Sequence, residues 1–152
     1  MKQIDTSTSL SINGERSRTI EIYIDGASKG NPGPSGIGVV ICRDGKTIKN
    51  ISSFIGNATN NVAEYTALIY ALQEALIIKA QNIMINTDSQ LIYRQLKKIY
   101  KIKSPNILGL YNQVTHLMSA FTEVGLNHIS RNLNRGADKL ANLAIRQAMR
   151  RN

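Results

Sequence analysis

The hydrophobic pattern changes its period along this chain, and that change limits the folds the chain can adopt. Apolar and polar residues alternate in residues 19–25 (TIEIYID), as in a half-buried strand. Residues 37–42 form a short apolar run, and residues 47–54 return as its partner after the hairpin signal Asp44-Gly45. In residues 61–80 the apolar positions recur at helical spacing instead. We therefore expect three opening strands, arranged as an antiparallel meander, followed by a helix.

The remaining pattern alternates between strands and helices. The predicted elements are a buried strand at 82–87, helices at 89–98 and 105–121, a fifth strand at 126–130 and a last helix at 134–150. A helix between the third and fourth strands implies a parallel crossover beside the antiparallel meander. The pattern thus predicts an α/β fold, a five-stranded mixed sheet in the order βββαβααβα with flanking helices. Residues 26–36 are rich in Gly, Pro, Asn and Ser and predict a turn.

Length and composition indicate one globular domain. The chain has 152 residues, of which 42% are hydrophobic, and it contains no apolar run long enough to span a membrane. Residues 1–18 are polar and predict a flexible N-terminal tail ahead of a domain at 19–152. This tail lacks the apolar stretch of a secretory signal, and the single cysteine, Cys42, can form no internal disulfide. We expect a cytoplasmic protein.

The charge balance favours a polyanionic partner. There are 19 Lys and Arg against 10 Asp and Glu, a formal net charge of +9. In residues 79–103 six basic residues accompany one acid, Asp88, and in residues 131–152 six basic residues accompany Asp138. Acids in basic surroundings are typical of a metal site that faces phosphates. Charge alone does not exclude a protein that is merely basic and soluble.

Four acids occupy positions from which they can converge. Asp25 and Asp88 each end a predicted strand, and Glu64 and Asp138 each lie in the first turn of a predicted helix. Carboxyl ends of strands and starts of helices meet at one rim of such sheets. Gathered carboxylates repel one another unless a cation intervenes, and hard divalent cations such as Mg²⁺ prefer oxygen ligands. Taken singly, Glu64 and Asp138 are also ordinary acids for a first helical turn, so the surrounding residues must decide.

Each acid lies within a longer motif. Asp25 opens DGASKGNPGPSGIGVVI, Glu64 lies in TNNVAEYTAL, Asp88 lies in NTDSQ, and Asp138 lies in RNLNRGADKLANLA. These four motifs, in this order, resemble those of the ribonuclease H family, type 1, and the similarity spans residues 19–149. The chain is most similar to the short, archaeal-like subgroup that lacks the tryptophan-bearing basic protrusion.

The resemblance implies an enzyme that cuts the RNA strand of an RNA–DNA hybrid. Asp25, Glu64, Asp88 and Asp138 would hold two Mg²⁺ ions, with Mn²⁺ as a substitute, and Asp25 would bridge them. The products would carry 5′-phosphate and 3′-hydroxyl ends. The family's substrate contacts carry over to Gly26, Ser28, Asn31, Asn60, Asn61 and Gln90. Neutral donors of this kind suit the 2′-hydroxyls of a wide minor groove. A monomer is the default for this family.

The chain departs from many bacterial members in front of the last acid. Those members carry a long loop with a histidine there, whereas here His128 falls within a predicted strand and His116 within a predicted helix, both positions of ordinary structural histidines. Arg131 is a candidate substrate contact or stand-in for the loop histidine. Asn134 is a second candidate contact, although an N-cap of the last helix explains it equally well.

Three other functions are alternatives to a hybrid nuclease. A catalytically silent nucleic-acid-binding module on the same fold would not need the intact acid set. A different nuclease or strand-transfer enzyme on this fold would have other acid spacing, and a packaging protein would need no acids in a basic chain. A nucleotide-binding loop is excluded at residues 30–33, because the Gly-Lys-Ser/Thr ending is missing and a strand follows.

Overall fold

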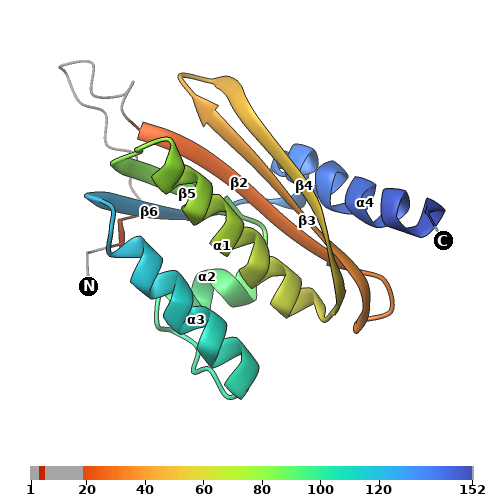
Figure 1. The fold of residues 1–152 in the computed structure, drawn as a ribbon. Coiled ribbons are helices and arrows are strands. Elements are labelled where there is room, and N and C mark those ends of the chain that lie inside the picture. Colours follow the sequence, from red (N-terminus) through yellow and green to blue (C-terminus); the bar gives the residue numbers. More distant parts are fainter. Residues whose placement is uncertain (1–3, 6–18, 152) are drawn as a thin grey trace.

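In the computed structural model, residues 4–5 and 19–151 are described, and they form one mixed sheet with helices on both faces (Figure 1). The strands are β1 (Ile4–Asp5), β2 (Thr19–Ser28), β3 (Gly33–Arg43), β4 (Lys46–Ala58), β5 (Asn82–Thr87) and β6 (Glu123–His128). The helices are α1 (Asn60–Ile77), α2 (Gln90–Leu96), α3 (Pro105–Met118), the 3₁₀ helix η2 (Arg131–Leu133) and α4 (Arg135–Arg150). The predicted order βββαβααβα is confirmed from β2 onward.

The sheet joins an antiparallel half to a parallel half. Its order is β1-β6-β5-β2-β3-β4, in which β2, β3 and β4 pair antiparallel, and β2, β5, β6 and β1 pair parallel. The predicted five-stranded core is therefore present, and β1 extends it by two residues beside Val124 and Gly125. The tail prediction did not anticipate β1. The remainder of that predicted tail lies outside the described residues.

Alternation along the strands separates two apolar layers. Ile22 and Ile24 of β2 are fully buried in the main core, which also takes in Leu68 and Leu72 of α1 and apolar residues of α2 and α3. On the opposite face, Ala137, Ala141, Ala144 and Ile145 of α4 are buried against β2, β3 and β4 (Figure 1). None of the helices among residues 19–151 combines the length and apolar character needed to cross a bilayer.

The predicted turn at residues 26–36 is wrong for most of its length. β2 continues to Ser28 and β3 begins at Gly33, so only residues 29–32 lie between the strands. Gly26 in this stretch serves close packing against a helix, as does Gly38 further along β3, whereas Gly30, with a φ of 96°, does lie in the turn. A Cβ on Gly26 would lie 2.3 Å from the backbone carbon of Ala63 in α1, and one on Gly38 would lie 2.0 Å from the carbonyl oxygen of Ala137 in α4.

Two further boundaries differ from the sequence prediction. β6 runs from Glu123 to His128 instead of 126–130, and η2 fills the space before α4. α1 begins at Asn60, with the Thr59 side chain accepting from the Val62 N–H as its N-cap. Glu64 therefore lies beyond the first turn of α1, whereas Asp138 lies in the first turn of α4 as predicted.

Candidate active site

Three of the four predicted acids meet where β2 and β5 stop pairing. Ile24 of β2 is opposite Thr87 of β5, so the next residues, Asp25 and Asp88, emerge side by side from parallel strands. Glu64 arrives from α1, whose backbone can approach β2 because Gly26 has no side chain. One carboxylate oxygen from each of the three acids lies within 4.8 Å of the others. Such a spacing permits all three to reach one cation.

Asp138 approaches this cluster from the opposite helix. It is exposed on α4, and Asn142 Nδ2 donates to its Oδ1 over 3.2 Å. Asp138 is not among the three mutually close acids, but it is near enough to add to the rise in the pKa of Asp25. The structure therefore places it beside the cluster as a more distant member.

Burial makes the charged form of these acids unfavourable without a cation. Asp25 and Glu64 are only 6% and 8% exposed. Burial, followed by the Asp88 charge, raises the pKa of Asp25 to about 7. Burial and then the charges of Asp25 and Asp88 raise the pKa of Glu64 well above its usual range, against a smaller opposing effect from a Gly26 N–H hydrogen bond.

Among residues 19–151, no basic side chain forms an ion pair with the cluster. Within the part of the chain that the structure describes, the one ion pair is Lys49–Glu74, which involves none of these acids. Glu64 Oε2 is buried and has no hydrogen-bond partner there. Clustered carboxylates with an unsatisfied oxygen are the ligands that a hard divalent cation prefers. The residues present thus fit a metal centre.

Asn134 lies beneath the acids and is almost fully buried, at 1% exposure. Its Nδ2 donates to the Ile24 carbonyl over 2.8 Å and to Asp88 Oδ2 over 3.1 Å. It occupies the N-cap position of α4, but its side chain makes no capping hydrogen bond. The prediction that Asn134 is the N-cap residue of the last helix is confirmed in position, but its amide is engaged by β2 and Asp88 and not by the helix.

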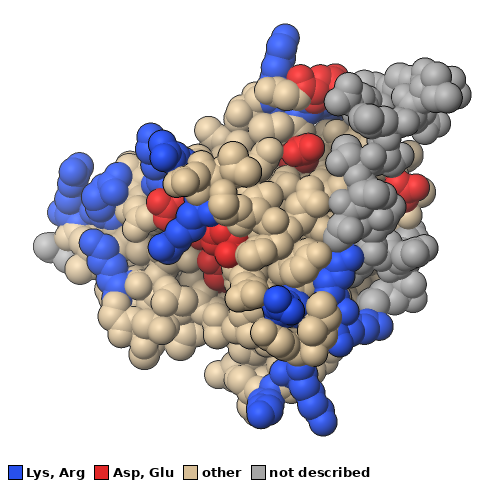
Figure 2. Space-filling model, turned by 180° about the vertical axis from the view of Figure 1, so that it is seen from behind, with Lys and Arg blue, Asp and Glu red and all other residues tan. Residues whose placement is uncertain are grey.

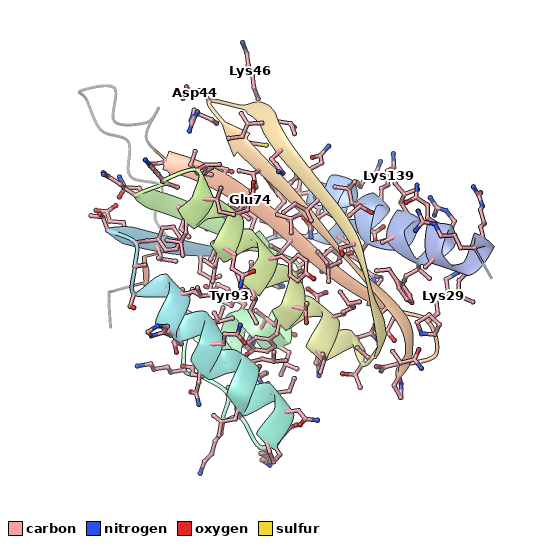
Figure 3. The ribbon with its side chains drawn as sticks, in the orientation of Figure 1. Lys29, Asp44, Lys46, Glu74, Tyr93 and Lys139 are labelled. Carbon is pink, nitrogen blue, oxygen red and sulfur yellow. The ribbon has the colours of Figure 1, made fainter. Side chains whose placement is uncertain are left out.

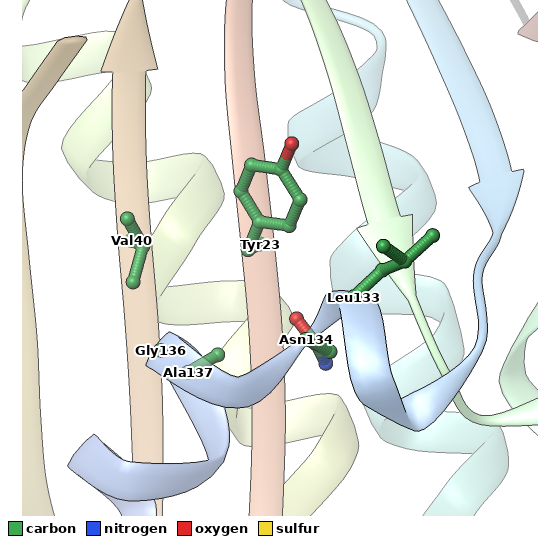
Figure 4. Close-up of a pocket in the computed structure, with 6 residues that line it drawn as sticks. All are labelled: Tyr23, Val40, Leu133, Asn134, Gly136 and Ala137. Atoms are coloured by element: carbon green, nitrogen blue, oxygen red, sulfur yellow. The ribbon is translucent and has the colours of Figure 1, made fainter. Parts of the chain in front are cut away.

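A hollow of about 180 Å³ lies on the other side of Asn134 (Figure 4). Tyr23 and Val40 of the sheet line it together with Leu133, Gly136 and Ala137 at the η2–α4 junction. The Tyr23 hydroxyl donates to Glu21 over 3.1 Å. Burial, and then the Glu21 charge, raise the Tyr23 pKa to about 12, so the phenol stays protonated at neutral pH.

Three predicted substrate contacts form one network at the ends of β2 and α1. The Ser28 N–H donates to Asn60 Oδ1 over 3.0 Å, and the Asn60 N–H donates to Asn31 Oδ1 over 2.9 Å. The Ser28 hydroxyl donates to the Ala58 carbonyl over 2.7 Å. Both asparagines are exposed and use their oxygens inward. Their amide NH₂ groups make no hydrogen bond among the described residues, which leaves them as donors for a ligand.

The other predicted contacts are separate from this network. Asn61 is exposed in the first turn of α1, and Gln90 is exposed at the start of α2, two residues after Asp88. With its amide turned to match donors with acceptors, Gln90 accepts from Arg94 Nε and Nη2 over 3.2 and 3.0 Å. Arg131 is exposed on η2.

Comparison with known proteins decides the family. The model of a family described as reverse transcriptase-like matches residues 23–144. The chain is 37% identical to Ribonuclease HI of Halobacterium salinarum over 135 residues, which is 88% of this chain and 68% of that protein. The chain belongs to the ribonuclease H family. Against the bifunctional protein Rv2228c of Mycobacterium tuberculosis it is 41% identical over 83% of its own length but only 35% of that protein.

Solved ribonuclease H structures share this fold. The crystal structure of RNase H1 from Halobacterium salinarum superposes with a TM-score of 0.83 at 37% identity, covering 85% of this chain and 98% of that one. The LC11 RNase H1, solved in complex with an RNA/DNA hybrid, gives a TM-score of 0.81 at 40% identity, covering 86% and 99%. These likenesses confirm the predicted family, its archaeal-like subgroup and the fold.

The acids of this ribonuclease H chain lie among basic side chains. Figure 2 shows acidic atoms near the middle of one face, with Lys and Arg on either side. Lys29, in the turn between β2 and β3, is exposed, and so is Lys139, which follows Asp138 on α4 (Figure 3). Basic side chains therefore lie on this face together with acidic ones, and Lys139 directly follows Asp138 in the chain.

Sequence reasoning missed two features near the ribonuclease H acids. His128 ends β6, where its Nε2 lies 3.4 Å from the Asp88 carbonyl oxygen and its ring lies 5.6 Å from that of Tyr93. This position was predicted as an ordinary sheet histidine, and no sequence signal pairs it with Asp88. The bridge made by Asn134 was missed as well, because an Asn just before a helix has the simpler interpretation of a cap.

Proposed function

We propose that this chain is an endonuclease that hydrolyses the RNA strand of RNA–DNA hybrids. The observation that carries the proposal is the close cluster of Asp25, Glu64 and Asp88, the first two of them buried, which has no basic partner among the described residues of an otherwise basic chain. The family membership supports it, as does the hybrid-bound structure of a relative at 40% identity. We infer that the chain leaves 5′-phosphate and 3′-hydroxyl ends and acts as a cytoplasmic monomer without a nucleotide cofactor.

The four acids would hold the catalytic metal. Asp25, Glu64 and Asp88 supply oxygens from mutually close positions, and Asp138 adds an exposed carboxylate beside Asp25. When bound, two Mg²⁺ ions, or Mn²⁺ in their place, would activate a water and stabilise the leaving oxygen. The acids must be deprotonated to act as ligands. The burial of Asp25 and Glu64 limits the access of bulk water to their carboxylates.

The asparagine network would recognise the minor groove of the hybrid. Asn31 and Asn60 direct their oxygens into the protein, so their NH₂ groups are available to hydroxyls and base edges. Asn61 and Gln90 would add further uncharged contacts to the hybrid. Gly26 and Ser28 would let the protein backbone come close to the nucleic acid. Lys29, Arg131 and Lys139 would attract phosphates without reading sequence.

The test is cleavage of an end-labelled strand in four substrates. The labelled strand is RNA in the hybrid, in single-stranded RNA and in double-stranded RNA, and it is DNA of the same sequence in double-stranded DNA. We expect internal cuts in the RNA of the hybrid, with Mg²⁺ or Mn²⁺ present, and none in single-stranded RNA, while the double-stranded RNA shows how far the enzyme depends on a DNA partner strand. Asp88→Asn should abolish them. The matched control is Asp44→Asn at the exposed β3–β4 hairpin, whose φ of 53° suits Asn as well as Asp.

Two results would contradict the proposal. Hybrid binding without cleavage under either metal would make the chain a catalytically silent module on the ribonuclease H fold. Equal cutting by the wild-type and Asp88→Asn proteins would place the chemistry elsewhere.

A further inference from the structure

We propose that Asn134 is a positioning residue that holds Asp88 in its metal-binding geometry, a role that rests on the proposed metal site. Asn134 connects the elements that carry three acids. Its side chain reaches the Ile24 carbonyl, next to Asp25, and the carboxylate of Asp88. Its backbone carbonyl oxygen accepts from the backbone N–H of Asp138 over 3.1 Å, in the first turn of α4. A shift of Asn134 would therefore disturb Asp25, Asp88 and Asp138 together.

The two donors of the Asn134 amide are both used. A side-chain NH₂ group has two N–H bonds, and here one goes to Ile24 and the other to Asp88 Oδ2. A neutral donor fixes the carboxylate without cancelling its charge, so Asp88 keeps its full attraction for a cation. Lys or Arg at this position would instead compete with the metal. The chemistry of the contact is thus what an outer partner of a metal ligand requires.

The orientation of the amide is forced by its surroundings. Turning it over would place Oδ1 against the Ile24 carbonyl and the Asp88 carboxylate, which are both acceptors. In the observed orientation Oδ1 is buried on the side of Tyr23 and has no partner among the described residues (Figure 4). An unsatisfied buried acceptor costs free energy. The fold accepts that cost in order to keep both donors on Ile24 and Asp88.

The burial of Asn134 separates this role from direct substrate binding. At 1% exposure its side chain lies beneath Asp88, whereas the candidate contacts Asn31, Asn60 and Asn61 are exposed. The hollow in front of its oxygen is lined mainly by Tyr23, Val40 and Leu133, and not by the acids. We therefore assign Asn134 to the support of the metal site instead of the nucleic-acid surface.

The test measures Mn²⁺ binding in the absence of nucleic acid, by calorimetry, on the full chain. Asn134→Ala removes the amide, and Asn134→Asp keeps its shape but replaces the donors with a charge facing Asp88. We expect both variants to bind Mn²⁺ about 10-fold or more weakly, the usual effect of removing an outer partner of a ligand. Asn127→Ala is the matched control, because it removes a half-buried amide that donates to Asn86 over 3.3 Å and, among the described residues, makes no hydrogen bond with the four acids.

A second measurement needs no variant and so does not depend on their folding. In the wild-type protein, NMR should show the Asn134 side-chain amide protons protected from exchange and shifted when Mg²⁺ is added. The exposed Asn61 amide supplies the reference for a group open to solvent. Exchange of Asn134 at the rate of Asn61 would overturn the assignment.

The outcomes separate this inference from the proposed function. Wild-type affinity for Mn²⁺ in both Asn134 variants, with weaker hybrid binding, would make Asn134 a substrate contact and refute the positioning role. Weakened Mn²⁺ binding in the Asn134 variants, together with no hybrid cleavage by the wild-type protein, would uphold the positioning role and refute the nuclease. Normal melting temperatures beside weakened Mn²⁺ binding would show that the effect is local to the metal site.

Discussion

The burial of Asp25 beside Asp88 makes the stability of the metal-free protein depend on pH. The folded pKa of Asp25, about 7, lies above its ordinary value of 3.8, so folding favours the protonated acid. Its contribution to stability is complete below about pH 4 and is lost as the pH rises through about 7. In chelator, the free energy of unfolding should fall by about 1–4 kcal/mol between pH 4 and pH 8, since each pKa unit is worth about 1.4 kcal/mol. Urea denaturation at several pH values measures this.

Two comparisons attribute that pH dependence to the acid cluster. Asp25→Asn should flatten the profile and stabilise the metal-free protein at pH 8, whereas Asp44→Asn at the exposed hairpin should leave it unchanged. Added Mg²⁺ should restore wild-type stability at pH 8, because it binds only the folded site. A wild-type profile parallel to that of Asp25→Asn would show that burial of this acid has no energetic consequence.

Strand β3 and helix α4 pack through the backbone itself, and this contact positions Asp138 and Asn134. A Cβ at Gly38 would lie 2.0 Å from the Ala137 carbonyl oxygen and 2.8 Å from the Ala141 nitrogen, and neither backbone atom can move alone. Gly38→Ala should therefore lower the free energy of unfolding by about 2 kcal/mol or more, as overpacking does. It should also slow hybrid cleavage by displacing α4.

Gly109→Ala is the control for this substitution. Gly109 lies in α3, and an added Cβ there meets no atom within 4 Å. Removing a glycine from a helix interior should raise the stability by about 0.5–1 kcal/mol and leave cleavage unchanged. Equal stability of Gly38→Ala and wild type in urea denaturation would contradict the close approach of α4 to β3.

The order of elements was predictable from periodicity, but the glycine contacts were not. Alternation in residues 19–25 and helical spacing in residues 61–80 depend on local sequence alone, and both predictions are confirmed. Gly26, in contrast, is needed because helix α1 packs directly on it, and the glycine-rich composition of residues 26–36 led to the wrong prediction of a turn there. The meeting of Asp25 with Asp88 follows from parallel pairing, whereas the bridge from Asn134 depends on tertiary geometry that no spacing encodes.

The whole molecule carries a net charge of +9, and its binding to a hybrid should weaken with salt. Four phosphate contacts would lower the affinity about 100-fold between 50 and 200 mM salt, because each contact releases counterions. Asp88→Asn protein allows this binding to be measured without cleavage. Lys139→Ala, beside Asp138, should reduce the slope of log K against log salt by about 1. Lys46→Ala, at the β3–β4 hairpin (Figure 3), should leave the slope unchanged, and equal slopes for both variants would refute an interface on the acidic side.

The most direct test of the central claim, that the acids make this fold a metal-dependent hybrid nuclease, is the Mg²⁺ dependence of hybrid cleavage. Wild-type and Asp25→Asn proteins would be freed of metal with a chelator and then titrated with Mg²⁺ on a hybrid with a labelled RNA strand. We predict no cleavage by the metal-free wild type, full recovery with Mg²⁺, and no recovery in Asp25→Asn at any concentration. Cleavage by the metal-free wild type, or equal recovery in the variant, would contradict the account.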